Sequence, residues 1–160
     1  MATYRAAEVP DAPALSQLAR RALQPYALPG WTRPAIERLL NGNSETALRD
    51  SLPKAAFAHV GLESGSVVGF IASASPRLVG LLVVDPLHQR HGIGSRLLEA
   101  MFEFVAVHAP EVSIVEINAT QYSLPFYRRH GFYPLSEFID HDGCRFARLG
   151  YWRNNPLLIR

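Results

Sequence analysis

The chain has 160 residues of even composition, 48% hydrophobic and 19% charged, which predicts a single domain over residues 1–160 and argues against a disordered or fibrous protein. Its formal net charge is only +2 and its basic residues are scattered, so no nucleic-acid partner is expected. Its apolar runs are shorter than the roughly 18 residues of a membrane helix, its N-terminus lacks a secretory pattern and its lone Cys144 cannot form an internal disulfide, so we expect a cytoplasmic protein with no membrane partner.

The first half of the chain predicts one strand, several helices and then a series of strands. Residues 3–9 suit a strand, and Asp11 with Pro13 opens a helix whose apolar residues recur at helical spacing. Residues 34–40 and 44–52 predict two short helices. From residue 55 the period changes, and the segments AFAHVGL, VVGFIASAS and RLVGLLVVD predict three strands in a hairpin series.

The second half predicts two helices, a buried strand and a hairpin. After a turn at residues 88–94, apolar residues at helical spacing predict a helix that ends before Pro110. Residues 112–119 predict a strand, Ser123 and Gly131 bound a short helix, and FYPLSEFI and CRFARLGYW flank HDG as an antiparallel hairpin. The strand-helix-strand unit implies a parallel pair in an otherwise antiparallel sheet, and hence a mixed α/β fold of the α+β type.

The turn QRHGIG, residues 89–94, follows a strand and opens a helix. Backbone N–H groups at such a helix start point outward at the positive end of the helix dipole and bind phosphate oxygens. Gly92 and Gly94 allow close backbone approach, and nearby arginines add positive charge. A plain turn that needs glycine for its dihedrals is the alternative. The P-loop string is absent, and Leu97 stands where a dinucleotide fingerprint needs a small residue.

Two longer stretches carry a family resemblance. Residues 81–98, LLVVDPLHQRHGIGSRLL, and residues 118–132, NATQYSLPFYRRHGF, resemble the two signature regions of the GNAT superfamily of acetyl-CoA-dependent N-acetyltransferases. The resemblance implies a mixed, mostly antiparallel sheet of six to seven strands, with a central splayed parallel pair and about four flanking helices. It also implies an acyltransferase that uses acetyl-CoA as co-substrate.

The same resemblance implies a site for coenzyme A. Backbone amides of the glycine turn would hold the pyrophosphate, and the preceding strand would pair with the pantetheine amides. The residues implied in cofactor binding are Leu82, Val83, Val84, Gln89, Arg90, His91, Gly92, Ile93, Gly94, Ser95, Arg96, Asn118, Phe126 and Tyr127.

The resemblance also implies catalytic roles. Tyr127 matches the tyrosine that protonates the leaving sulfur, although a core aromatic is the alternative, and the N–H of Val84 would polarise the thioester carbonyl. Some members place a glutamate where this chain has Leu78. Other polar residues are therefore considered as the base, each also readable as an ordinary surface group: Glu116, Asn118, His59 and Glu63. Asn118 and Glu116, on one strand face, are the candidates retained.

The acceptor is expected to be the primary amine of a small molecule. The sequence does not give the charge of the acceptor pocket, so a polyamine or the amine of a peptide or protein stays open. Family members bind the acceptor between the first helices and the last strands, so Tyr26 and Trp31 are substrate candidates, with Tyr133 and Trp152 as further aromatic candidates; each is also readable as core. Exposed edges of the last hairpin allow a homodimer. His and Cys spacing predicts no metal site, and Cys144 reads as a small buried hydrophobe.

Two functional hypotheses remain open. The first is an N-acetyltransferase that moves an acetyl group from acetyl-CoA to a small amine by direct attack, with Tyr127 as general acid. The second is a non-catalytic acyl-CoA-binding or regulatory domain that keeps the phosphate-binding turn without turnover. Retention of Tyr127 favours the enzyme, whereas Leu78 in place of a glutamate leaves the second hypothesis standing.

Overall fold

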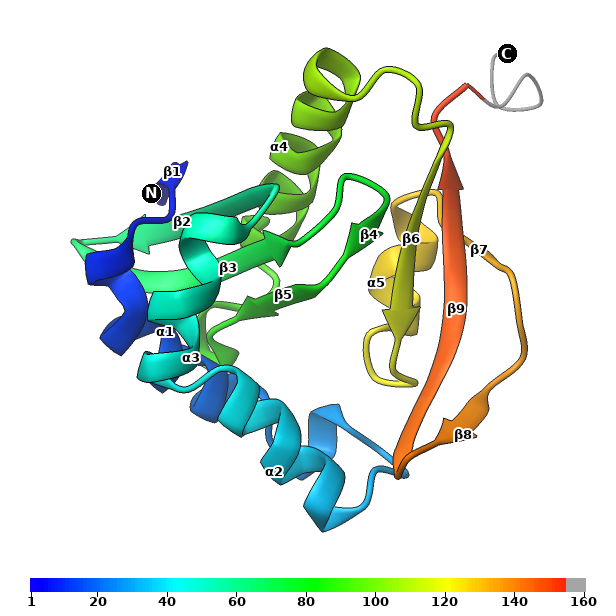
Figure 1. Ribbon diagram of the computed structural model, residues 1–160, viewed down its shortest axis with the longest axis horizontal. Helices are drawn as coiled ribbons and strands as arrows, with labels where there is room; N and C mark the ends of the chain where they lie inside the picture. Colours follow the sequence, from blue (N-terminus) through cyan, green and yellow to red (C-terminus); the bar gives the residue numbers. More distant parts are fainter. Residues whose placement is uncertain (155–160) are drawn as a thin grey trace.

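The computed structural model describes residues 1–154, which form helices around two β-sheets (Figure 1). The α-helices are α1 (Ala12–Ala22), α2 (Arg33–Gly42), α3 (Glu45–Ser51), α4 (Ile93–His108) and α5 (Leu124–Arg129). The strands are β1 (Thr3–Ala6), β2 (Phe57–Glu63), β3 (Ser66–Ser73), β4 (Leu78–Val79), β5 (Leu81–Val84), β6 (Ile114–Ala119), β7 (Tyr133–Pro134), β8 (Ile139–His141) and β9 (Cys144–Trp152). Short 3-10 turns lie at η1 (Val9–Asp11), η2 (Pro25–Ala27), η3 (Leu52–Lys54) and η4 (Pro86–His88).

The two sheets meet at the segment that contains β4 and β5. The first sheet has the antiparallel order β1-β2-β3-β5, and the second has the order β4-β6-β9-β7 with β8 paired to β9. Among the described strands only β4 and β6 run parallel, with Leu78 opposite Glu116 and Val79 opposite Ile117. After β4 the chain leaves β6 and continues as β5, which pairs with β3 (Figure 1). The predicted mixed class with a splayed parallel pair is confirmed.

The strand predicted over residues 77–85 differs from expectation, because it divides at Gly80 into β4 and β5. A Cβ atom on Gly80 would lie 3.0 Å from the carbonyl oxygen of Ala72, the same oxygen that accepts a hydrogen bond from Gly80 N–H. This close approach lets the chain change partners from β6 to β3. The nine strands of residues 1–154 fall into two sheets, whereas the family resemblance implied one sheet of six to seven strands.

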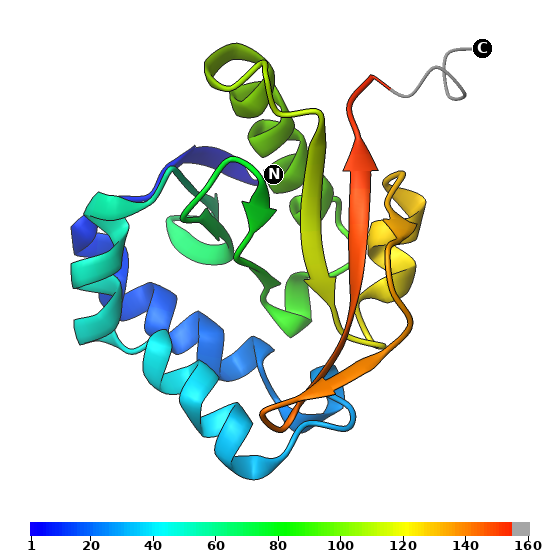
Figure 2. The same cartoon turned by 45° about the vertical axis from the view of Figure 1, so that its right-hand side comes forward.

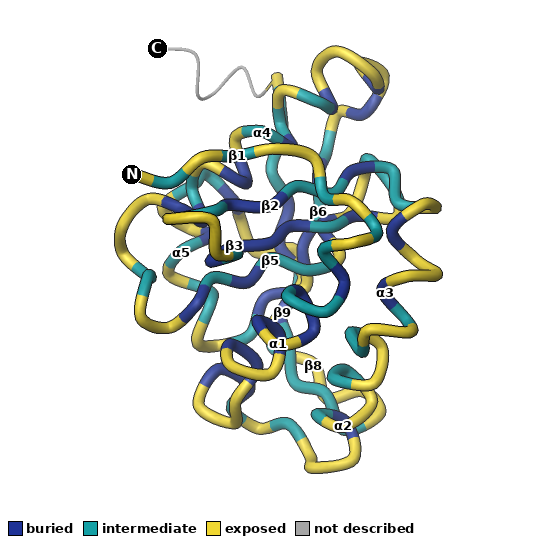
Figure 3. Tube along the Cα trace, turned by 90° about the vertical axis from the view of Figure 1, so that its left-hand side faces the viewer, coloured by how far each residue is buried: buried dark blue, intermediate teal, exposed yellow. Residues whose placement is uncertain are grey.

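Helices cover both faces of the first sheet. Alternate residues of β3 point to opposite sides, so Ile71 packs with Leu97 and Met101 of α4, and Phe70 packs with Leu15 and Leu18 of α1. Figure 3 shows the buried residues gathered along β2, β3 and β5 and on the inward side of α1. This packing fixes the start of α4 beside the end of β5.

The N-terminal helices also reach the C-terminal hairpin. The Thr32 N–H, just before α2, donates to Gly143 O at 2.8 Å, and the Trp31 indole N–H donates to Arg145 O at 2.9 Å. Figure 2 shows α2 beside the hairpin of β8 and β9. These contacts close a cavity between segments far apart in the chain, since Trp31 and Arg145 are separated by 114 residues.

Candidate active site

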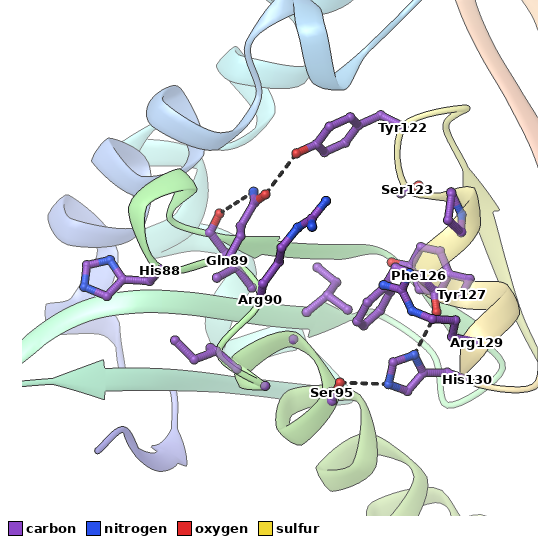
Figure 4. A pocket seen from close by; sticks show the side chains of 16 residues that line it. His88, Gln89, Arg90, Ser95, Tyr122, Ser123, Phe126, Tyr127, Arg129 and His130 are labelled. Atoms are coloured by element: carbon purple, nitrogen blue, oxygen red, sulfur yellow. Dashed lines mark hydrogen bonds between the residues drawn. The ribbon is translucent and has the colours of Figure 1, made fainter.

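A groove of about 370 Å³ opens between the end of β5, the start of α4 and helix α5 (Figure 4). We call it the α4 groove. It is lined on one side by Leu82, Val84, His88, Gln89, Arg90, Gly92, Ile93, Gly94 and Ser95. It is lined on the other side by Tyr122, Ser123, Pro125, Phe126, Tyr127, Arg129 and His130.

The floor of the α4 groove is the N-terminus of α4. Gly92 caps the helix with φ of 81°, a left-handed conformation that favours glycine, and the first hydrogen bond of α4 runs from Arg96 N–H to Gly92 O. The N–H groups of Ile93, Gly94 and Ser95 therefore have no partner within the helix. At Gly94, a Cβ atom would lie 3.3 Å from the ring of Phe126, so glycine lets α5 pack closely against α4. Such a helix start suits an anion.

The turn that leads into α4 is held by Asp85. Its carboxylate accepts from the Leu87 N–H at 2.9 Å and from Arg21 Nε of α1 at 2.8 Å. Burial opposes ionisation of Asp85, but these two donors outweigh it and lower the pKa of the carboxyl. His88 lies between Asp85 and Glu63, with Nδ1 3.6 Å from the first and Nε2 3.3 Å from the second. The turn is thus tied to α1 and β2.

On the opposite wall, His130 links α5 to α4. Its Nδ1 donates to Phe126 O at 2.7 Å, which leaves Nε2 to accept from Ser95 Oγ at 2.8 Å (Figure 4). Arg90 and Arg129 also line the groove, so two positively charged side chains face it. The groove therefore combines unpaired backbone donors with positive side chains, a set that suits phosphate groups.

The edge of β5 that faces away from β3 borders the α4 groove. Gln89 Nε2 donates to Val84 O at 3.3 Å, so this carbonyl points to the open edge, and the N–H of the same residue points the same way in an extended strand. Tyr122 OH donates to Gln89 Oε1 at 2.9 Å, which links β5 to the loop before α5 (Figure 4). An extended ligand that contains amides can pair with such an edge.

A second cavity, of about 350 Å³, lies on the other side of the splayed strands. We call it the Trp31 cavity. The N-terminal region lines it with Ala22, Leu23, Ala27, Leu28, Trp31 and Leu39. The strands and their following loop line it with Gly80, Leu81, Leu82, Val83, Val84, Gln89, Ile117, Asn118, Thr120, Tyr122, Ser123, Tyr127, Cys144 and Phe146.

Tyr127 lines both the α4 groove and the Trp31 cavity. Its side chain is 4% exposed and makes edge contacts with Phe126 and Phe132. Burial raises the pKa of Tyr127, so the phenol stays protonated at neutral pH. A protonated hydroxyl at the junction of two cavities can donate a proton to a group that reacts there.

The structure brings most of the predicted cofactor residues into the α4 groove. Val83 and Asn118 line the Trp31 cavity instead, because the side chain of Val83 points toward α1 and Asn118 ends β6. His91 and Arg96 lie outside both linings, and Arg96 pairs with Glu99 at 3.5 Å.

The other predicted site residues divide in the same way. Trp31 lines the Trp31 cavity, as expected for a substrate candidate. Tyr26 is 49% exposed, packs edge-on against Tyr122 and lies outside both linings. Glu116 also lies outside both linings and accepts from Arg148 at 2.9 Å. The remaining base and aromatic candidates, His59, Glu63, Tyr133 and Trp152, line neither. Cys144 lines the Trp31 cavity and is half-buried.

Sequence reasoning missed several lining residues. Tyr122 and His130 lie within the second signature region, residues 118–132, but were given no role, although an aromatic hydroxyl and an imidazole inside that region were a usable signal. Leu28, Leu39 and Phe146 carried no signal, because apolar residues of this kind read as core until the chain is folded.

A helix start with amides that have no partner in the helix, beside the outer edge of β5 in a splayed mixed sheet, is typical of coenzyme A-dependent acyltransferases. A model of the acetyltransferase (GNAT) domain family matches residues 28–150, and the chain belongs to this family. It is therefore an acyltransferase, and GNAT acetyltransferases use acetyl-CoA. No curated protein sequence matched the chain.

Solved structures share the fold over nearly the whole chain. A GCN5-related N-acetyltransferase from Rhodopseudomonas palustris is similar with a TM-score of 0.80 and 15% identity, covering 94% of each chain. The PaiA N-acetyltransferase from Thermoplasma acidophilum, in complex with coenzyme A, gives a TM-score of 0.73 and 17% identity, over 95% of this chain and 99% of that one. YncA from Salmonella typhimurium, with its cofactor acetyl-CoA, gives a TM-score of 0.68 and 17% identity, over 97% of this chain and 95% of that one.

Two further features are absent from residues 1–154. No helix among them has the length and apolar character to cross a bilayer. No group of three or more His, Cys, Asp or Glu side chains among them could hold a metal ion.

Proposed function

We propose that one N-acetyltransferase domain over residues 1–160 transfers an acetyl group from acetyl-CoA to the primary amine of a small molecule. The observation that supports this most is the position of Tyr127, which lines both the α4 groove and the Trp31 cavity. Two cavities that share one buried hydroxyl suit a reaction between two substrates that enter from opposite sides.

The proposed site for the coenzyme is the α4 groove. The N–H groups of Ile93, Gly94 and Ser95 would hold the pyrophosphate, and Arg90 and Arg129 would add charge to the same anion. The open edge of β5 at Val84 would pair with the amides of the pantetheine arm. Gln89 Nε2 already occupies the Val84 carbonyl, so its side chain must release that oxygen when the arm binds.

The proposed chemistry is direct transfer. The nitrogen of the free amine forms a bond to the thioester carbon and the carbon–sulfur bond breaks. The proton that the nitrogen then loses passes through water to the Tyr127 oxygen and restores the phenol. Val84 N–H stabilises the negative charge that develops on the carbonyl oxygen, and Tyr127 donates its proton to the sulfur. Asn118, on the cavity side, positions the amine by hydrogen bonding. Glu116 is occupied by Arg148 and takes no proton in this proposal.

The test is a comparison of two Tyr→Phe variants. Tyr127→Phe removes the proton donor, and we expect kcat to fall by about a hundredfold or more, while the Kd for coenzyme A changes little. The control is Tyr151→Phe, because Tyr151 packs on the same Phe132 ring but lies outside both linings. Release of free thiol measures turnover, and calorimetry measures coenzyme A binding. Equal turnover of the two variants would remove Tyr127 from the mechanism.

A further inference from the structure

The Trp31 cavity is apolar over most of its wall. Its lining includes the large apolar side chains Leu23, Leu28, Trp31, Leu39 and Phe146. Among the described residues that line it there is no Asp, Glu, Lys, Arg or His. The cavity therefore offers no counter-charge to a ligand.

The polar groups in this wall are mostly engaged already. The indole N–H of Trp31 donates to Arg145 O at 2.9 Å, so the ring presents carbon to the cavity. Tyr122 OH donates to Gln89, and the hydroxyls of Thr120 and Ser123 lie 3.2 Å apart in a hydrogen bond. Among the described residues, the side chains left to meet a polar ligand group are Asn118, the weakly polar thiol of Cys144, and Tyr127, which the cavity shares with the α4 groove.

This distribution decides what the body of the acceptor can be. A charged group that moves from water into an apolar cavity loses its hydration, and without an opposite charge the loss is not recovered. A second ammonium or a carboxylate on the acceptor is therefore disfavoured. An apolar body gains from burial against the leucines, Trp31 and Phe146.

The reacting nitrogen faces the same constraint. No carboxylate or imidazole lines the cavity among residues 1–154, so no such group can take a proton from an ammonium there. Glu116 is paired with Arg148 outside the lining, and His59 stacks on Phe57 in β2. An ammonium must therefore lose its proton to water before the nitrogen reaches the thioester.

From these observations we infer that the acceptor is a primary amine with a compact, apolar and otherwise uncharged body, and that it enters the Trp31 cavity as the free base. The inference rests on the proposed function, since it names the acceptor class of the same reaction. The cavity volume of about 350 Å³ lies at the small end of ligand sites and excludes large polycations and folded peptides.

The first experiment measures kcat/KM for three amines at one pH with saturating acetyl-CoA. The amines are 2-phenylethylamine, phenylalanine, which adds a carboxylate to the same body, and 1,4-diaminobutane, which carries a second ammonium. We expect the first to exceed each of the other two by about a hundredfold. A preference for either charged amine would overturn the inference.

A matched pair of variants tests the location. Leu39→Glu places a carboxylate in the cavity wall, and we expect the ratio of activity on 1,4-diaminobutane to activity on 2-phenylethylamine to rise by about tenfold or more. Leu40→Glu is the control, because Leu40 is the next residue of α2, is equally half-buried and lies outside the lining. Equal ratios in the two variants would place the acceptor elsewhere.

The pH profile tests the free-base requirement. The β,β-difluoro analogue of 2-phenylethylamine has a much more acidic ammonium and nearly the same shape. We expect the pH at which kcat/KM levels off to shift downward with the pKa of the amine. Profiles that coincide for the two amines would assign deprotonation to a group of the enzyme and overturn this part of the inference.

A binding measurement separates failure of this inference from failure of the proposed function. In a Trp152→Phe background, fluorescence reports Trp31 alone, because the chain has 2 tryptophans. With coenzyme A bound, we expect uncharged 2-phenylethanol to change the emission at concentrations where 1,4-diaminobutane does not. If 1,4-diaminobutane changes the emission at lower concentrations than 2-phenylethanol, the inferred acceptor class is overturned, even if no amine turns over. Failure to bind coenzyme A instead contradicts the proposed function.

Discussion

Tyr127 illustrates how one residue can satisfy two interpretations of the sequence. It was open whether this tyrosine is a core aromatic or a proton donor, and in the structure it is 4% exposed within the main apolar cluster and also lines both cavities. Burial raises the pKa of the phenol and so keeps the proton that the proposed reaction needs. Tyr127 can therefore be part of the apolar core and also serve as the proton donor of the proposed reaction.

A second titratable group, His59, predicts a pH dependence of stability. It stacks on Phe57 with ring centroids 4.4 Å apart, and burial lowers its pKa from 6.5. The unfolded chain then takes up a proton near pH 6.5 that the folded chain takes up only at lower pH. This difference makes the fold less stable as pH falls from 6.5 through the folded-state pKa.

His59→Phe keeps a ring at this position and removes the titration. We expect the free energy of unfolding of the wild type, measured with urea at pH 7.5 and pH 5, to fall more on acidification than that of the variant. A drop of the same size in both proteins would show that His59 titrates alike in the folded and unfolded states.

Among the elements, the segment of β4 and β5 determines where the sheets part. Gly80 approaches the Ala72 carbonyl so closely that a methyl group there would force that carbonyl to shift by a few tenths of an ångström. Gly80→Ala is expected to lower the free energy of unfolding by about 1–3 kcal/mol in urea titrations. Gly42→Ala is the control, because a Cβ there meets no atom within 4 Å. Equal stabilities would show that the division of the strand does not depend on this contact.

The start of α4 can be tested with two glycines of nearly the same conformation. Gly92 has φ of 81° and Gly65, in the turn between β2 and β3, has φ of 79°, and a Cβ on either meets no atom within 4 Å. Valine at either position is expected to lower stability by about 1–2 kcal/mol. Only Gly92→Val should weaken coenzyme A binding, by about tenfold or more in calorimetry. Equal affinity of the two variants would remove Gly92 from the phosphate site.

The elements were more predictable from the sequence than the cavities they form. Periodicity located the helices and most strands, because it records which face each element buries, and the second motif located Phe126 and Tyr127. The division at Gly80 was not predictable, since it depends on the Ala72 carbonyl of another strand. For the same reason the hydrogen bond from Tyr122 to Gln89 was not predictable, because the two residues are 33 positions apart in the chain.

At the scale of the whole molecule, the two sheets and the helices at their junction produce two cavities that share a wall. The start of α4 borders one cavity, and the N-terminal helices with the C-terminal hairpin close the other through the contacts of Trp31 and Thr32 (Figure 2). The family resemblance predicted that the acceptor binds between these same regions. It did not predict that the cavity has no charged side chain in its lining, because that lining forms only when distant segments of the chain meet.

The measurement that tests the central claim most directly is a titration of ¹⁵N-labelled protein with coenzyme A, followed by NMR. If the N-terminus of α4 holds the phosphates, the backbone amides of Ile93, Gly94 and Ser95 will show the largest shift changes and slower hydrogen exchange, while Gly65 stays unchanged. Saturable binding of coenzyme A that leaves these three amides unperturbed would contradict the claim.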